Sequence, residues 1–314
     1  MMWSEELEGL RAKTREFSDG LKQGFAAVPP LESTPPHVSR DLRMSGEGAY
    51  PAPVVLDHAE DRTVGANADI AVRVIIPDRV KGVYLHFHGG GWVLGNRSSQ
   101  DEMLDRIANR SDVAVVSVEY PLAPENPYPA GPDVCEQAAL WLAHNAATEF
   151  GTSNLVIGGD SAGAHLAALT LIRLRDHHDA AKAYRGANLV YGWYDLTLTP
   201  SAARWEEQLI LTPGNLRWFC DCFLGGRSLE ERRAPSISPM YADLSGLPPA
   251  LFTAGTRDPL IDDSLFMAAR WELAGNEADL ALYPEEVHGF TRLPSPTADI
   301  ANARCDAFVR DCVN

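Results

Sequence analysis

Short apolar runs alternate with helix-patterned segments over most of this chain. The predicted strands are residues 70–76, 83–87, 113–118, 155–158, 187–191, 250–254 and 278–283. Segments with helical spacing lie between them, at 101–110, 132–145, 162–175 and 263–274. A strand that is apolar on both faces has to be covered on both faces, which is typical of a parallel sheet between layers of helices. The alternation therefore predicts a doubly wound α/β fold.

Two regions interrupt this alternation. Residues 1–27 have the pattern of one or two amphipathic helices, and the Pro-rich segment 28–38 after them is expected to form neither a helix nor a central strand. Residues 192–247 are too long for a plain connection and are expected to hold a pair of inserted helices. We predict that both regions form a cap over the carboxyl edge of the sheet. The predicted division is N-terminal cap helices and connector 1–50, α/β domain 51–191, inserted cap helices 192–247 and the rest of the α/β domain 248–314.

The net charge of −16 makes nucleic acid an unexpected partner, because an acidic surface repels phosphates. No apolar run is long enough to span a membrane, and the N-terminal residues lack the pattern of a secretory signal. The five cysteines cannot all pair with one another, and their spacing fits no zinc site. We therefore expect free thiols, a cytoplasmic location, and no metal or cofactor.

The segment Gly159-Asp160-Ser161-Ala162-Gly163 satisfies the pattern G-x-S-x-G. An apolar strand precedes it and a helix rich in alanine and leucine follows it. In that context the serine occupies a tight, strained turn, so that its hydroxyl projects from the edge of the sheet. The glycines on either side let strand and helix approach closely. We therefore predict that Ser161 is a nucleophile.

Three successive glycines follow the predicted strand 83–87, within the run His-Phe-His-Gly-Gly-Gly-Trp at residues 86–92. Their N–H groups are not covered by side chains and can donate to a developing oxyanion. In hydrolases with this pattern they act together with the N–H of the residue after the nucleophile, which is Ala162 here.

A serine hydroxyl needs a base to attack a carbonyl, and the base needs an orienting carboxylate. The expected chain order is serine, acid, histidine. His288 follows the last predicted strand and is the predicted base. Asp258 lies nearest the end of strand 250–254, where the functional groups of open α/β sheets gather, and is therefore preferred to Asp262 as the acid.

The remaining polar groups near these residues are interpreted as surface. Asp262 and Asp263 are expected to be the N-cap and first turn of the next helix. The spacing of four acidic residues fits no calcium-binding loop, and we expect their side chains to be solvated. These residues are Asp262, Asp263, Glu285 and Glu286. His177 and His178 are expected to be exposed at a polar helix end.

Together these motifs resemble the hormone-sensitive-lipase-like family of bacterial esterases, over residues 84–290. The resemblance rests on HFHGGGW at 86–92, EYPLAPENPYPA at 119–130, GGDSAGAHLA at 158–167, GTRDPLIDD at 255–263 and HGF at 288–290. It implies an α/β-hydrolase fold with a mostly parallel sheet of about eight strands and a helical cap. It also implies a homodimer through the edge of the last strand. The roles it implies are nucleophile, acid and base for Ser161, Asp258 and His288, and oxyanion donors for Gly89, Gly90 and Ala162.

The predicted activity is hydrolysis of small, uncharged carboxylic esters with short to medium acyl chains. Two alternatives keep the fold: an arylformamidase or other amide hydrolase, which would form the same oxyanion, and a small-molecule receptor without catalysis. The residues predicted to bind substrate are Trp92, Asp160, Trp193 and Tyr194. Trp92 adjoins the oxyanion loop, whereas Trp193 and Tyr194 either line a pocket or pack the cap against the sheet.

Overall fold

The computed structural model describes residues 3–26, 30–47, 51–67 and 69–314. Its centre is an eight-stranded sheet in the order β1-β2-β4-β3-β5-β6-β7-β8. The strands are β1 (Glu60–Val64), β2 (Ile70–Ile75), β3 (Gly82–Phe87), β4 (Val113–Val118), β5 (Leu155–Asp160), β6 (Tyr184–Val190), β7 (Ala250–Arg257) and β8 (Ala278–Val287). The six strands from β4 to β8 in this order pair in parallel with one another. Strand β2 is antiparallel to both of its neighbours, β1 and β4.

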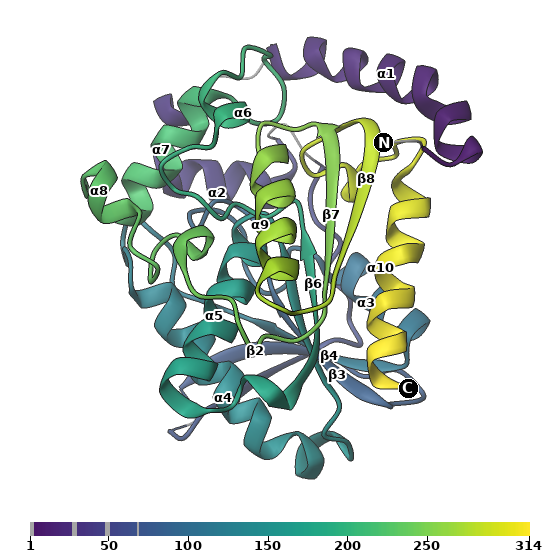
Figure 1. Ribbon diagram of the computed structural model, residues 1–314, viewed down its shortest axis with the longest axis vertical. Coiled ribbons are helices and arrows are strands. Elements are labelled where there is room, and N and C mark those ends of the chain that lie inside the picture. The colour runs from purple at the N-terminus through teal and green to yellow at the C-terminus, as the bar shows by residue number, and fades with distance from the viewer. Residues whose placement is uncertain (1–2, 27–29, 48–50, 68) are drawn as a thin grey trace.

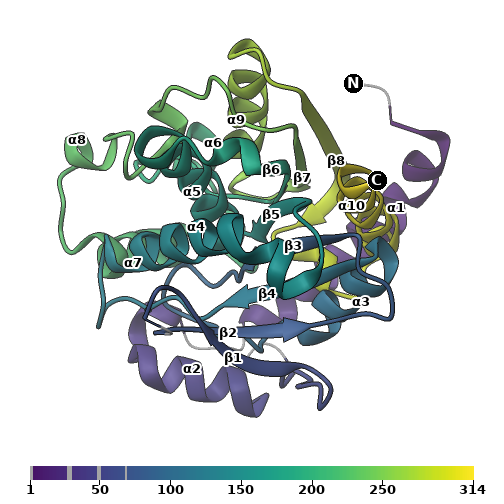
Figure 2. The same cartoon turned by 90° about the horizontal axis from the view of Figure 1, so that it is seen from below.

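Helices cover both faces of this sheet (Figures 1 and 2). On one face lie α4 (Ala130–Phe150), α5 (Ala162–His178) and α9 (Ile261–Leu273), and on the other lie α3 (Asp101–Ser111) and α10 (Ala298–Val313). The N-terminal segment contributes α1 (Glu5–Ala26), the 3-10 turn Leu31–Ser33 and α2 (Pro36–Ser45). Between β6 and β7 lie α6 (Pro200–Ala203), α7 (Pro213–Leu224), α8 (Leu229–Arg232) and the 3-10 turn Pro239–Tyr241. Further 3-10 turns are Ala181–Ala183 and Phe290–Arg292.

All seven predicted strands are present, and the predicted α/β-hydrolase fold is confirmed. The eighth strand, β1, was not predicted because it is a polar edge strand: only Val64 of its five residues is buried. The parallel strands are almost entirely buried, as their unbroken apolar sequences indicate. The predicted four-part division of the chain stays a prediction.

The Pro-rich segment 28–38 differs from its prediction. Helix α2 begins at Pro36, inside that segment, with Pro35 as its N-cap. Proline is accepted at the first helical position because the N–H that it lacks would have no partner there. Residues 28 and 29 of the segment lie outside the described residues. The inserted region also differs from the expected pair of helices, since only α7 is longer than a single turn.

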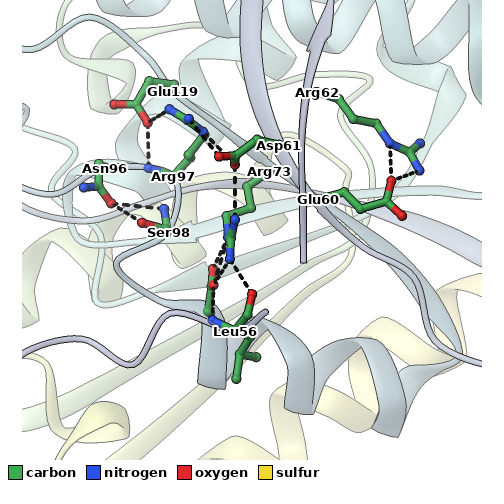
Figure 3. Close-up of polar contacts among 10 residues, drawn as sticks. Leu56, Glu60, Asp61, Arg62, Arg73, Asn96, Arg97, Ser98 and Glu119 are labelled. Carbon is green, nitrogen blue, oxygen red and sulfur yellow. Dashed lines mark hydrogen bonds and ion pairs between the residues drawn. The ribbon is translucent and has the colours of Figure 1, made fainter. Parts of the chain in front are cut away.

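A buried arginine joins the antiparallel strands to the start of α3 (Figure 3). Arg73 on β2 is only 6% exposed and forms a close ion pair with Asp101, at 2.7 Å. It also donates to the backbone oxygen of Leu56 and pairs with Asp61. Asp61 in turn binds Arg97, which belongs to the loop after the glycine run. The network therefore anchors the segment that leads from the glycine run to α3.

Strand β8 forms one edge of the sheet, and α1 lies across its carboxyl end. Ser18 of α1 donates to the backbone oxygen of Glu285, and Arg11 and Arg15 bind the Glu285 carboxylate. The homodimer expected through this edge stays a prediction. Among the described residues, no helix has the length and apolar character needed to cross a membrane.

Candidate active site

Ser161 lies at the sharp turn between β5 and α5. Its φ of 56° and ψ of −119° are strained for a residue with a side chain, and such strain is concentrated at functional sites. The Ser161 N–H donates to the Val190 oxygen at 2.8 Å, which holds the turn against the next strand. Gly163 allows this turn, because a Cβ there would collide with the backbone oxygen of Phe87. The turn thus presents the hydroxyl at the carboxyl edge of the sheet.

Ser161, His288 and Asp258 form one chain of hydrogen bonds. Ser161 Oγ lies 2.9 Å from His288 Nε2, and His288 Nδ1 lies 2.8 Å from Asp258 Oδ2. A carboxylate only accepts, so Nδ1 carries the proton and Nε2 is left to accept from the serine. The three residues follow β5, β8 and β7, whose carboxyl ends meet at the same edge. Asp258 is fully buried, and its other oxygen accepts from the N–H of Leu260.

Tyr191 packs against the imidazole of His288. The two rings meet edge to face, with centroids 4.9 Å apart. Tyr191 has a φ of 36°, which is unusual for an aromatic residue, and its hydroxyl lies 2.7 Å from Thr291 Oγ1. The turn that carries His288 is thereby joined to the end of β6. Neither Tyr191 nor Thr291 belongs to a sequence motif that would have revealed this contact.

The glycine run corrects one predicted oxyanion donor. The N–H of Gly89 donates to Asp160 Oδ1 at 3.0 Å and is not available to an oxyanion. Gly90 and Gly91 line the same cavity as Ser161, and neither N–H has a hydrogen-bond partner among the described residues. The same holds for Ala162 at the N-terminus of α5, where N–H groups lack intrahelical partners. The available donors are therefore Gly90, Gly91 and Ala162.

Backbone geometry explains why glycine stands at these two positions. Gly90 and Gly91 have φ values of 126° and 60°. A Cβ at Gly91 would collide with the ring of Phe219, and one at Gly90 with the backbone oxygen of Leu94. At Gly91 the loop therefore lies closer to helix α7 than a residue with a side chain would allow, and at Gly90 it folds closely against Leu94.

Asp160 lines the cavity, but its carboxylate is held by the protein. Oδ1 accepts from Gly89 N–H and from Gln100 Nε2, the latter at 2.8 Å. Burial alone would raise the pKa of Asp160, but the nearby Arg292 charge and the Gln100 hydrogen bond keep it below its usual value. An ionised Asp160 therefore fixes the glycine loop, and its predicted contact with substrate stays a prediction.

One cavity of about 1030 Å³ opens in front of Ser161. Its walls come from the N-terminal segment, the region between β6 and β7, and the turns at the carboxyl edge of the sheet. Representative lining residues are Phe25, Leu31, Leu42, Gly90, Gly91, Leu94, Met103, Asp160, Ser161, Tyr191, Trp193, Leu209, Leu211, Phe219, His288, Arg292, Ala298 and Asn302. Trp193 borders this cavity but is only 2% exposed, and its predicted contact with substrate stays a prediction.

Trp92 and Tyr194 are not on this wall, which corrects their predicted contact with substrate. Trp92 is 1% exposed; it stacks on Phe223 of α7 and donates to His165 Nδ1 at 3.2 Å. Tyr194 is fully buried, and its ring meets that of Phe252 edge to face. Trp92 packs against α7 and Tyr194 packs against β7, which for Tyr194 is the packing alternative.

The acidic residues expected at the surface are engaged in contacts instead. Asp263 is fully buried in the first turn of α9 and accepts from the N–H groups of Tyr194 and Asp195 and from the hydroxyl of Thr199. Burial raises the pKa of Asp263 to about 7. Glu286 is fully buried and accepts hydrogen bonds from Ser295 and Thr297, Asp262 accepts from Ser201, and Glu285 binds arginines of α1. Leu260, not Asp262, is the N-cap of α9.

Comparison with known proteins identifies the family to which the chain belongs. The family described as alpha/beta hydrolase fold matches residues 84–292. A carboxylesterase of Mycobacterium tuberculosis (strain H37Rv) is 33% identical over 303 residues, covering 91% of this chain and 88% of that protein. The chain belongs to the hormone-sensitive-lipase-like esterases of the α/β-hydrolase superfamily, which are carboxylic-ester hydrolases. The resemblance stated from the motifs is thereby confirmed.

Solved esterase structures agree with this assignment. The hyperthermophilic esterase from Pyrobaculum calidifontis superposes with a TM-score of 0.81 at 29% identity, covering 95% of this chain and 98% of that one. A thermostable esterase from Pseudomonas putida superposes with a TM-score of 0.85 at 27% identity, covering 97% and 98%. The likeness therefore extends over nearly the whole length of each chain.

Proposed function

We propose that the chain hydrolyses carboxylic esters through an acyl-enzyme on Ser161, with His288 as general base and Asp258 as the acid that orients it. The observation that carries this proposal is the continuous hydrogen-bond chain from Asp258 to Ser161, with the serine facing the cavity. Its geometry supports the proposed roles, because the distance from Ser161 to His288 allows proton transfer and the bond from His288 to Asp258 orients the imidazole.

In the first half of the reaction, Ser161 Oγ attacks the ester carbonyl as its proton passes to His288 Nε2. Asp258 keeps the other imidazole nitrogen protonated and stabilises the imidazolium that forms. The carbonyl oxygen becomes an oxyanion facing the N–H groups of Gly90, Gly91 and Ala162. Loss of one such donor typically lowers kcat by about 10²–10³-fold. His288 then gives its proton to the leaving alcohol.

In the second half, water takes the place of the alcohol. His288 removes a proton from this water as its oxygen attacks the acyl carbon, and the same donors hold the second oxyanion. Collapse of this intermediate releases the carboxylic acid, and the proton returns from His288 to Ser161. In each half of the reaction, His288 therefore first accepts a proton and then donates it, while Asp258 orients its ring.

The cavity supports small, uncharged esters with short to medium acyl chains as substrates. It is at the upper end of the ~300–1,000 Å³ typical of small-molecule sites. Apolar side chains such as Leu31, Leu42, Leu209 and Phe219 supply much of its wall. Such a wall favours acyl and alcohol groups that lose little hydration on entry.

A series of p-nitrophenyl esters, from acetate to dodecanoate, tests the proposal with the wild type and Ser161→Ala. We expect a maximum at a short or medium chain and a loss of at least about 10³-fold in Ser161→Ala. Labelling by a fluorophosphonate probe should occur in the wild type and be absent in the variant. Equal rates in both proteins would refute the proposed nucleophile. Faster turnover of formanilide than of the esters would instead identify an amide hydrolase, and neither turnover nor labelling would indicate a receptor.

A further inference from the structure

Three side chains converge where α4 and α5 run side by side. His177 and His178 are the last two residues of α5, and Glu136 projects from α4. Glu136 Oε1 lies 2.7 Å from His177 Nδ1 and 3.0 Å from His178 Nε2. These three donor atoms all lie within 4.8 Å of one another. Two imidazole nitrogens therefore gather around one carboxylate oxygen.

The Glu136 carboxylate is held in place from its other side. Its Oε2 accepts from Arg173 Nη1 at 3.2 Å, and the same nitrogen binds Asp133 at 2.8 Å. Arg173 is therefore shared between the carboxylates of Asp133 and Glu136, and Glu136 Oε1 is the oxygen that faces the two imidazoles.

Two imidazoles and a carboxylate form a donor set that suits Zn²⁺ and other late divalent transition metals. Tetrahedral ligands ~2.0–2.1 Å from Zn²⁺ are ~3.3 Å apart, so the pairs at 2.7 and 3.0 Å have to open by a few tenths of an ångström. The side chains of His177 and His178 are 56% and 32% exposed, which leaves room for that movement and for water as a further ligand.

The protons of the two imidazoles are accounted for when a metal ion replaces their hydrogen bonds to Glu136. In the hydrogen-bonded arrangement, His177 Nδ1 and His178 Nε2 each carry a proton toward Glu136. On metal binding, each proton moves to the other nitrogen of its ring, or leaves to solvent if the ring was an imidazolium. No oxidant or reductant takes part.

The end of α5 adds a second attraction for a cation. The last carbonyl groups of a helix carry partial negative charge, and His177 and His178 stand in that last turn. The chain as a whole carries a net charge of −16. Both features favour a divalent cation at this place over an anion.

We propose that Glu136, His177 and His178 form a binding site for Zn²⁺ or a similar divalent metal, which joins α4 to α5. Helix α5 begins directly after Ser161 and rises by about 1.5 Å per residue, so the site is ~25 Å from the serine. The site is therefore a structural link beyond the proposed hydrolysis, and its failure would leave that proposal untouched.

The test uses the full chain, freed of metals with a chelator and titrated with ZnCl₂ by calorimetry. We expect one ion per chain, a rise in Tm of about 3–5 °C at saturation, and visible d–d absorption on binding of Co²⁺. His177→Ala and Glu136→Gln should weaken binding at least about tenfold and abolish the Tm rise. His144→Ala removes an exposed histidine of the same helix α4 and should bind like the wild type.

Circular dichroism and p-nitrophenyl ester turnover of each metal-free variant show whether it is folded. The proposal is overturned if the wild type binds no Zn²⁺, or if His177→Ala and Glu136→Gln bind it as tightly as His144→Ala. A third ligand variant, His178→Asn, preserves the polar surface and should lose binding in the same way.

Discussion

The carboxylate of Asp160 accepts the N–H of Gly89 at 3.0 Å, although the two residues are 71 positions apart in the chain. This bond joins the glycine loop after β3 to the turn that carries Ser161 after β5. The loop therefore reaches its position through the residue directly before the proposed nucleophile. Gln100 completes the arrangement by donating to the same carboxylate oxygen.

Asp160→Ala is expected to lower kcat for p-nitrophenyl butyrate by about 10–100-fold, because it leaves the buried Gly89 N–H without an acceptor. Asp160→Asn retains an oxygen at the same place and should stay within about fivefold of the wild type. Steady-state kinetics of both variants measure this difference. An equal loss in the two variants would mean that the charge of Asp160, rather than its hydrogen bond to Gly89, supports the reaction.

Tyr191→Phe removes the hydroxyl that binds Thr291 and should lower kcat by about 3–10-fold, with KM changed less than twofold. Thr291→Val should have the same effect, and the double variant should lose little more, since both changes break one bond. The matched control is Tyr184→Phe, which removes the bond to Ala139 at the other end of β6 and should leave kcat unchanged. Additive losses would show that Tyr191 and Thr291 act separately.

Arg73→Met should reduce the free energy of unfolding by about 3–5 kcal/mol, because it leaves Asp101 buried without its partner. Arg62→Met is the control: it breaks the more exposed ion pair with Glu60, visible beside Arg73 in Figure 3, and should cost less than about 1 kcal/mol. Urea unfolding followed by circular dichroism measures both values. A similar loss in the two variants would contradict the importance given to burial.

Asp263 should make the fold less stable as pH rises. Its pKa is about 7 in the folded chain and near 4 when unfolded, so the folded state binds the extra proton between these values. The free energy of unfolding should therefore fall, by up to about 1.4 kcal/mol per pH unit, as pH rises through this window. Asp263→Asn should flatten that part of the profile, measured by urea unfolding at several pH values. An unchanged slope would show that Asp263 is ionised in the fold.

Residues that lie next to their partners in a local motif could be predicted from the sequence. The turn at Ser161 depends on a strand before it and a helix after it, and both are strongly patterned. The same is true of Asp258 and His288, which directly follow strands at the same sheet edge. Strand β1 could not be predicted, because its polar edge position removes the apolar pattern.

Contacts between distant segments could not be predicted. The sequence shows three glycines but not that Asp160 occupies the N–H of the first, which shifts the available donors to Gly90 and Gly91. It shows acidic residues after β7 and within β8 but not that Asp263 and Glu286 are enclosed by hydrogen-bond donors. In each case the partner comes from a segment whose position is set only by the packed fold.

The stacking of Trp92 on Phe223 has a consequence for how this enzyme can diversify. Substitutions in α7 that reshape the cavity also press on the loop of Gly90 and Gly91, so a new substrate preference gained there puts the rate of acyl transfer at risk. Met103 on α3 and Ala298 on α10 also line this cavity, but they do not belong to the stack of Trp92 on Phe223. Directed evolution of acyl-chain preference should therefore accumulate its tolerated changes on the α3 and α10 side.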